Sequence, residues 1–246
     1  MKLTATDLRA MKQRGEKIAA LTSYDFFTTK LLDEAGIPLI LVGDSLGMVV
    51  LGYENTRSVT MEDMLHHVRA VARAKPSAVV VADMPYRTYE TDEQAVANAR
   101  RFAEAGADAV KLEGAVVPQI RAVVAAGIPV LGHIGLLPQS AAQYKMEGRT
   151  PESAARLVRD AQAVEAAGAF AMVVECVVPE VAGQITRAVR IPTIGIGSGP
   201  DCDGQILVVH DLLGLVTRLP KHARRYADLA AEMRRAFAAY KADVTG

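Results

Sequence analysis

The sequence lacks a net charge. Its 246 residues carry 28 Lys and Arg side chains against 28 Asp and Glu side chains. Proteins that bind nucleic acid or anionic membrane surfaces usually show an excess of basic side chains. The balance therefore argues against both partners and favours a small-molecule ligand. No segment is apolar and free of charge for long enough to span a bilayer, so we expect no membrane partner.

Cysteine is also scarce. Cys176 and Cys202 are the two thiols of the chain, and neither has a partner at metal-ligand spacing, which argues against zinc. Two isolated thiols are typical of a reducing compartment. The first residues show no apolar stretch of the kind that follows the basic start of a secretory signal. We expect a cytoplasmic protein.

A further absence concerns the fold. No G-x-G-x-x-G follows the first expected strand, which argues against a doubly wound, dinucleotide-binding sheet. The glycine-rich run GIGSG at 195–199 resembles a phosphate loop, but a tight exit from a strand is the commoner reason for such a run.

What the chain does contain is a repeated unit: an Ala-rich helix, a glycine, an apolar β-branched run and a closing polar residue. It occurs as EAGIPLILVGD, EAGADAVKLEG, AAGIPVLGH and EAAGAFAMVVE. The runs are apolar on both faces, as parallel strands covered by helices are. We expect strands at about 17–25, 38–45, 78–84, 108–113, 129–134, 170–176, 192–197 and 205–209.

Eight such strands predict the α/β class and one (β/α)8 TIM barrel spanning residues 1–246 as a single domain. Residues 152–167 have apolar positions at steps of three and four, which predicts a helix covering the barrel. The segment from KHARRYADLA at 221 onward predicts an amphipathic helix that either covers the barrel or contacts another subunit.

In such a barrel the active site lies at the C-terminal ends of the strands. The polar residues expected there are Asp44, Ser45, Asp83, Lys111, Glu113, His133 and Glu175. A single inward charge can be a structural ion pair, but several converging carboxylates require a cation, and oxygen ligands favour a hard ion such as Mg²⁺. Magnesium usually takes one or two protein carboxylates, which leaves another for acid or base chemistry. His133 could serve as a ligand, a proton shuttle or an orienting residue.

Three longer motifs, VGDSLGMVVLGYENTRSVTMEDMLHHVRAVAR, GHIGLLPQS and GSGPDCDGQILVVHDLLGL, resemble the ketopantoate hydroxymethyltransferase family, and the resemblance runs from TSYD at 22–25 to PKHARRYADL. It implies a barrel of the phosphoenolpyruvate/pyruvate-domain-like type. It also implies transfer of a hydroxymethyl group from 5,10-methylenetetrahydrofolate to 3-methyl-2-oxobutanoate, which gives 2-dehydropantoate in the first step of pantothenate and coenzyme A biosynthesis.

The resemblance also implies roles for single residues. Asp44 and Asp83 would bind one Mg²⁺ per subunit and the substrate chelated to it, Glu113 would complete the metal environment directly or through water, Ser45 and Lys111 would hold the keto acid, and Glu175 would be the catalytic base of a metal-stabilised enolate mechanism. Tyr24 and Ser198 are pocket contacts or, alternatively, turn and packing residues. The family forms large cytoplasmic homo-oligomers, typically decamers built as a pentamer of dimers.

The sequence departs from the family pattern at two places. The loop after Ser140, in PQSAAQYKMEGR, is shorter than usual, and Arg87 stands where a small residue is common, so the folate contacts near the third strand do not transfer. The alternatives are a magnesium-dependent lyase or mutase of the isocitrate lyase superfamily, which the absence of a K-K-C-G-H-like run disfavours, and a catalytically silent barrel, which would not need so many buried charges.

Overall fold

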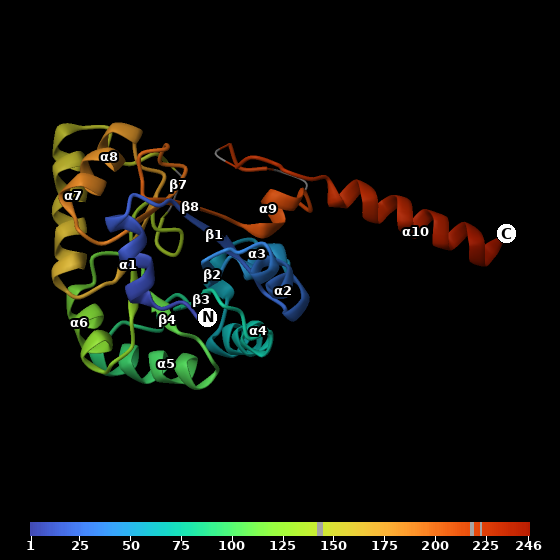
Figure 1. The fold of residues 1–246 in the computed structure, drawn as a ribbon, viewed down its shortest axis with the longest axis horizontal. Coiled ribbons are helices and arrows are strands. Elements are labelled where there is room, and N and C mark those ends of the chain that lie inside the picture. The colour runs from blue at the N-terminus through green and yellow to red at the C-terminus, as the bar shows by residue number, and fades with distance from the viewer. Residues whose placement is uncertain (142–144, 217–218, 222) are drawn as a thin grey trace.

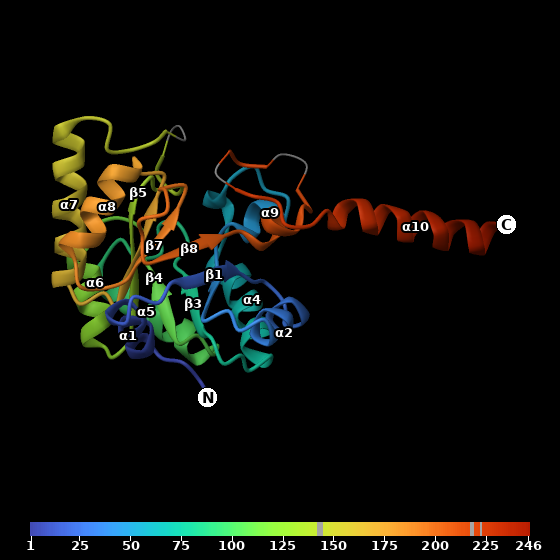
Figure 2. The same cartoon turned by 45° about the horizontal axis from the view of Figure 1, so that its top comes forward.

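Eight parallel strands form a closed barrel in the order β1 to β8 in a computed structural model that describes residues 1–141, 145–216, 219–221 and 223–246 (Figures 1 and 2). The strands are β1 (Ile18–Thr22), β2 (Leu39–Val42), β3 (Val79–Asp83), β4 (Ala109–Lys111), β5 (Val130–Gly135), β6 (Ala171–Glu175), β7 (Thr193–Ile196) and β8 (Gly204–Leu207). The eight strands predicted from the sequence are confirmed, each bound lying within three residues of the observed one.

The barrel closes where β8 meets β1. Ile18 pairs with Gly204 and Leu21 with Leu207, while Ala20 also pairs with Leu39 of β2 on the other side. A Cβ atom on Gly204 would lie 2.2 Å from the carbonyl oxygen of Ile18, closer than packed atoms approach. The closure therefore requires glycine at this position.

The chain also forms helices, most of them between strands. They are α1 (Ala5–Gln13), α2 (Phe26–Glu34), α3 (Leu46–Val49), the 3₁₀ turn η1 (Thr56–Ser58), α4 (Met61–Arg73), α5 (Asp92–Glu104), α6 (Val117–Ala125), α7 (Pro151–Ala166), α8 (Pro179–Ala188), α9 (Val209–Leu213) and α10 (Leu229–Thr245). The helix predicted at 152–167 is α7, and it buries Leu157, Ala161 and Val164. None of the helices in the described part of the chain is both long and apolar enough to cross a membrane.

The strands are buried on both faces, because their side chains alternate between two apolar clusters. In β3, Val79 and Val81 belong to the cluster inside the barrel, whereas Val80 and Ala82 belong to the cluster between strands and helices. Asp83 continues the inward series at the carboxyl end of the strand, since side chains alternate with a period of two.

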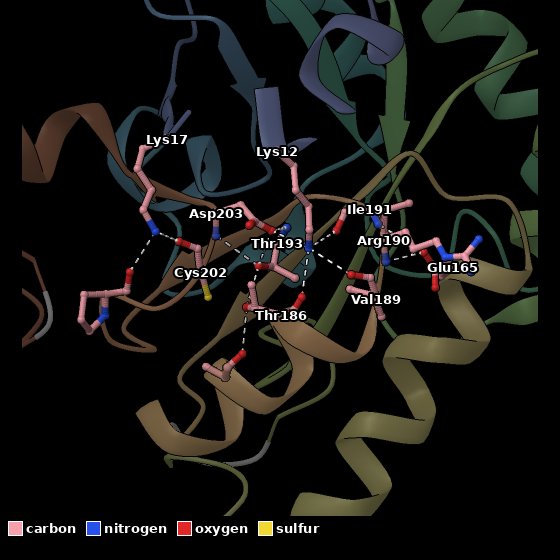
Figure 3. A network of polar contacts seen from close by, with 12 residues as sticks. Lys12, Lys17, Glu165, Thr186, Val189, Arg190, Ile191, Thr193, Cys202 and Asp203 are labelled. Atoms are coloured by element: carbon pink, nitrogen blue, oxygen red, sulfur yellow. Dashed lines mark hydrogen bonds and ion pairs between the residues drawn. The ribbon is translucent and has the colours of Figure 1, made fainter. Parts of the chain in front are cut away.

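Helix α1 covers the opposite end of the barrel, where Leu8 is fully buried in the inner cluster. Figure 3 shows the network that attaches this helix. Lys12 Nζ donates to the carbonyl oxygens of Thr186, Val189 and Ile191 at 3.0, 3.1 and 3.0 Å and forms an ion pair of 2.9 Å with Asp203. One ammonium thus joins α1 to the start of β7 and the start of β8.

Helix α10 projects away from the barrel and has no buried residue (Figures 1 and 2). Of the two alternatives expected for the last helix, the structure does not show the first, in which the helix covers its own barrel. The helix begins at Leu229 instead of near residue 221, and His222 of the expected basic start lies outside the described residues. Met233, Phe237, Tyr240 and Val244 are exposed at steps of four, three and four residues, so they share one face.

Candidate active site

The alternation of the strands places the predicted residues at one end of the barrel. Lys111 and Glu113 continue the inward position of Ala109 in β4, Glu175 continues that of Val173 in β6, and all point toward the barrel axis. Strand β2 ends at Val42, and Asp44 and Ser45 follow in the turn that leads into α3. The sequence alone therefore dictates most of this arrangement.

A cavity of about 380 Å³ lies at this end of the barrel and brings the predicted residues together. Its polar lining includes Asp44, Ser45, Asp83, Lys111, Glu113, His133 and Glu175. Its apolar lining includes Leu41, Met48, Val49, Val173, Ile196 and Ile206. A cavity lined by convergent charges and by aliphatic side chains suits a small, partly apolar anion.

Lys111 lies among the carboxylates. Its Nζ donates to Asp83 Oδ1 at 2.6 Å and lies 3.7 Å from Glu113 Oε1, with all three side chains about 95% buried or more. Burial lowers the pKa of Lys111, but the nearby carboxylates outweigh it, and the pKa is raised. Lys111 is therefore a permanent cation in the cavity.

His133 lies between two glutamates. Its Nδ1 is 3.5 Å from Glu113 Oε1 and its Nε2 is 3.2 Å from Glu175 Oε2. Burial lowers the pKa of His133, but the contacts with the two carboxylates raise it to about 9. For Glu113, burial raises the pKa, but His133 and Lys111 outweigh it and the pKa is lowered. Both ring nitrogens face carboxylates, which fits an orienting role better than a metal ligand.

Asp44 and Asp83 are neighbouring buried carboxylates. Burial, and then the charge of Asp83, raises the pKa of Asp44 well above its usual range, and burial raises the pKa of Asp83 even though Lys111 opposes it. The backbone N–H of Asp44 donates to Asp83 Oδ2 at 3.3 Å, so the two residues are adjacent. Together with Glu113 and Glu175, these two residues bring at least four carboxylates to the cavity. Their negative charge is more than one lysine and one histidine can neutralise.

The described residues contain no group of three or more His, Cys, Asp and Glu side chains arranged to hold a metal ion by themselves. Both Glu113 oxygens already have partners, Oε1 with Lys111 and His133 and Oε2 with the backbone N–H of Gln139. The arrangement fits a hard divalent cation that takes Asp44 and Asp83 and fills its remaining positions with water and substrate oxygens.

Tyr24 and Ser198, predicted as pocket contacts or as turn and packing residues, lie in different places. The hydroxyl of Tyr24 is 2.9 Å from Ser45 Oγ, so Tyr24 lies directly behind a cavity residue. Ser198 lies outside the cavity lining, where its hydroxyl donates to the carbonyl of Val174 and accepts from the N–H of Val177. These bonds fit the turn role for Ser198.

Comparison with known proteins assigns this chain to a family. The model of the family "Ketopantoate hydroxymethyltransferase" matches residues 2–246. The chain belongs to the ketopantoate hydroxymethyltransferase family. It is 54% identical to 3-methyl-2-oxobutanoate hydroxymethyltransferase of Dehalococcoides mccartyi, over 100% of this chain and 91% of the relative. It is 53% identical to that of Moorella thermoacetica, over 99% and 93%. The resemblance expected from the motifs is confirmed, and the chain is an enzyme of this family.

Solved structures of similar fold include a lyase and a hydrolase. A 2,3-dimethylmalate lyase of the PEP mutase/isocitrate lyase superfamily has a TM-score of 0.67 at 20% identity, covering 99% of this chain and 89% of its own. A phosphonopyruvate hydrolase in complex with oxalate and Mg⁺⁺ has a TM-score of 0.69 at 18% identity, covering 98% and 88%. At such identities the likeness shows the fold alone, and the predicted fold class is confirmed.

The two departures from the family pattern are the loop after Ser140 and Arg87. Residues 142–144 of the loop after Ser140 lie outside the described residues. Arg87 is exposed in a left-handed conformation with φ of 62°, and its Nε lies 3.8 Å from Glu90. Cys176 is half-buried just past β6 with φ of 48°, so it does not follow the alternation of the strand.

Sequence reasoning missed several residues of the site. Gln139 is buried and contacts Asp44 and Glu113, Tyr89 donates to Gln139, and Asp211 and Thr22 line the cavity. Asp211 and Thr22 lie on α9 and β1, outside the repeated unit on which the prediction rested. The motif GHIGLLPQS does contain Gln139, but a loop residue has no periodicity that would reveal its direction.

Proposed function

We propose that this chain transfers a hydroxymethyl group from 5,10-methylenetetrahydrofolate to 3-methyl-2-oxobutanoate, giving 2-dehydropantoate. The observation that carries the proposal is the cavity, which is lined both by Asp44, Asp83, Lys111 and Glu175 and by aliphatic side chains. A small branched oxo acid has matching chemistry, with two oxygens beside each other at one end and an isopropyl group at the other. Membership of the family supports the same substrate and the same donor.

We further propose that Asp44 and Asp83 hold one Mg²⁺ per subunit, with Glu113 supporting it through water. The excess of buried negative charge and the raised pKa values of both aspartates support a cation here. The related fold crystallised with oxalate and Mg⁺⁺ is consistent with this choice. When bound, the cation would act as a Lewis acid toward the keto oxygen of the substrate.

Glu175 is the proposed base that removes the proton from C3 of the substrate. Its side chain is 14% exposed at the cavity, and His133 Nε2 lies 3.2 Å from its Oε2. The imidazole restricts the position of the carboxylate, as a base that must meet one C–H bond requires. Removal of the proton leaves an enolate whose C3 forms the new bond to the one-carbon unit. The folate loses its methylene group, and one water supplies the hydroxyl oxygen.

Ser45 and Lys111 hold the carboxylate and keto oxygens, and the aliphatic wall receives the branched end. Lys111 is a fixed donor because Asp83 anchors it at 2.6 Å. Ser45 is oriented by Tyr24, whose hydroxyl lies 2.9 Å from it. Val173, Ile196 and Ile206 offer the apolar surface against which the isopropyl group would exclude water from C3.

The proposed assembly is a cytoplasmic homo-oligomer. It is a decamer built as a pentamer of dimers. The exposed face of α10, with Met233, Phe237, Tyr240 and Val244, supports a contact between copies, because a single chain leaves this apolar surface in water.

Proton exchange tests the proposed function. The protein is incubated with Mg²⁺ and 3-methyl-2-oxobutanoate in deuterated solvent, with and without the folate donor. We expect deuterium at C3 in both cases and 2-dehydropantoate only with the donor. Glu175→Gln should lose most of the exchange, and Asp44→Ala should lose metal-dependent substrate binding in calorimetry. Full exchange by Glu175→Gln would refute the base, and the absence of product from the wild type would refute the activity.

A further inference from the structure

Gln139 is a buried residue that the proposed reaction leaves without a role. It lies four positions after the last residue of β5 and is 2% exposed, although the next residue, Ser140, is exposed. A buried amide costs free energy unless hydrogen-bond partners compensate for the lost water. The partners of Gln139 therefore indicate what it does.

The side-chain amide of Gln139 is fully bonded. Its Nε2 donates to Asp44 Oδ2 and to the carbonyl oxygen of Met84, both at 2.9 Å, and its Oε1 accepts from the hydroxyl of Tyr89 at 2.7 Å. The carbonyl of Met84 can only accept, so the nitrogen of the amide must face it. The direction of the amide is therefore determined, and it presents a donor to Asp44.

The backbone of Gln139 is bonded on both sides as well. Its N–H donates to Glu113 Oε2 at 3.2 Å, and its carbonyl accepts from Arg57 Nε at 3.0 Å. Arg57 also donates to the carbonyl of Ala141 at 2.9 Å. One loop residue thus joins the ends of β2 and β4, while Arg57 attaches the same loop to the segment after α3.

We propose that Gln139 is a positioning residue for Asp44. Its amide holds Oδ2 and thereby sets the orientation in which the Asp44 carboxylate binds a divalent cation. The inference rests on the proposed function, which assigns the cation to Asp44. Hydrogen-bonding partners of metal ligands restrict ligand orientation, and their loss typically lowers metal affinity about 10- to 100-fold.

The alternative is that Gln139 only anchors the loop. Arg57 separates the two roles, because it holds the same loop through the carbonyls of Gln139 and Ala141 without bonding Asp44. Loss of Arg57 should loosen the loop and leave the Asp44 carboxylate in place. Loss of the Gln139 amide should release the carboxylate, while the backbone bonds of the loop remain.

The test measures binding of Mn²⁺ to the full-length protein in the absence of substrate. Electron paramagnetic resonance of the free ion monitors this binding. We expect Gln139→Met to raise the Kd for Mn²⁺ about 10- to 100-fold. Arg57→Met should leave the Kd within about 2-fold of the wild-type value, as expected for a substitution that does not affect the metal site. In the assay with Mg²⁺ held constant below saturation, Gln139→Met should lower kcat/KM in parallel with metal affinity, and saturating Mg²⁺ should restore most of it.

A double-mutant cycle completes the test. If Gln139 acts through Asp44, then in an Asp44→Asn background Gln139→Met should add no further loss of Mn²⁺ affinity. Equal Kd values for Gln139→Met and the wild type would overturn the inference, and so would an equal loss in Arg57→Met. If the wild type itself binds no Mn²⁺, the cation of the proposed function fails, and the inference fails with it. Should Gln139→Met not fold, Gln139→Asn carries the same expectation, because its shorter side chain cannot reach Asp44 and Met84 together.

Discussion

His133 Nε2 lies 3.2 Å from Glu175 Oε2 in the lining of the cavity. The opposite nitrogen faces Glu113, so the imidazole separates two carboxylates that would otherwise repel each other. The position of Glu175 therefore depends on a neutralising residue that does not itself need to touch substrate.

His133→Gln should slow C3 exchange about 10- to 100-fold, because an amide cannot serve both glutamates with the geometry of the ring, and general-base efficiency depends on alignment. Deuterium incorporation followed by NMR measures the effect. His66→Gln is the matched control, since His66 is exposed on α4. Equal exchange rates for the His133 variant and the wild type would show that Glu175 needs no such support.

Lys111→Met should destabilise the metal-free protein by about 3–5 kcal/mol, because it leaves the buried Asp83 carboxylate without its partner. The double variant Lys111→Met/Asp83→Asn should recover much of the stability, since an uncharged amide is less costly to bury than an unpaired carboxylate, yet it should remain inactive. Urea unfolding checks the stability, and the product assay checks the activity. If the double variant were as unstable as the single one, the ion pair would not be the source of the loss.

Lys12→Met should lower the free energy of unfolding by about 2–4 kcal/mol, because three carbonyl oxygens and Asp203 lose their common donor. The value of kcat in the remaining folded protein should change little, since these groups lie at the end of the barrel opposite the cavity. Lys17→Met is the control: Lys17 also donates to backbone carbonyls but is exposed, so we expect a loss below about 1 kcal/mol. Chemical denaturation compares the two, and equal losses would contradict the expectation.

Phe237→Glu should break the proposed contact between copies, because it places a charge in the centre of the exposed apolar face of α10. Sedimentation velocity should show a smaller particle than for the wild type. Ala242→Glu adds the same charge on the other side of the helix and should leave the particle size unchanged. A wild-type protein that sediments as a monomer would refute the proposed assembly.

Most of the cavity was predictable because it depends on strand alternation. The inward series Val79, Val81 and Asp83, and likewise Ala109 and Lys111, requires no information beyond the apolar pattern and the rule that barrel sites lie at the carboxyl ends of strands. The division of roles among the carboxylates was not predictable from spacing and came from the family motifs.

The remainder depends on segments without periodicity. Gln139 and Tyr89 lie on loops, where direction is set by tertiary contacts, and Ser198 turned toward the backbone of Val174 instead of the cavity. Helix α10 illustrates a different limit. Its amphipathic pattern predicts a helix with an apolar face, but an apolar face packs equally well on its own barrel or on another chain, and the pattern does not distinguish them.

Four oxygens lie within 3.1 Å of Lys12 Nζ, three of them carbonyls and one a carboxylate. Such a set of oxygens could bind a monovalent cation such as potassium or ammonium. Here the cation is the ammonium group of Lys12, which is covalently attached to α1. A tethered cation has a high effective concentration at its site and cannot be diluted or exchanged. The attachment of α1 should therefore be independent of the potassium concentration of the medium, and ammonium added to Lys12→Met has a ready-made site to occupy.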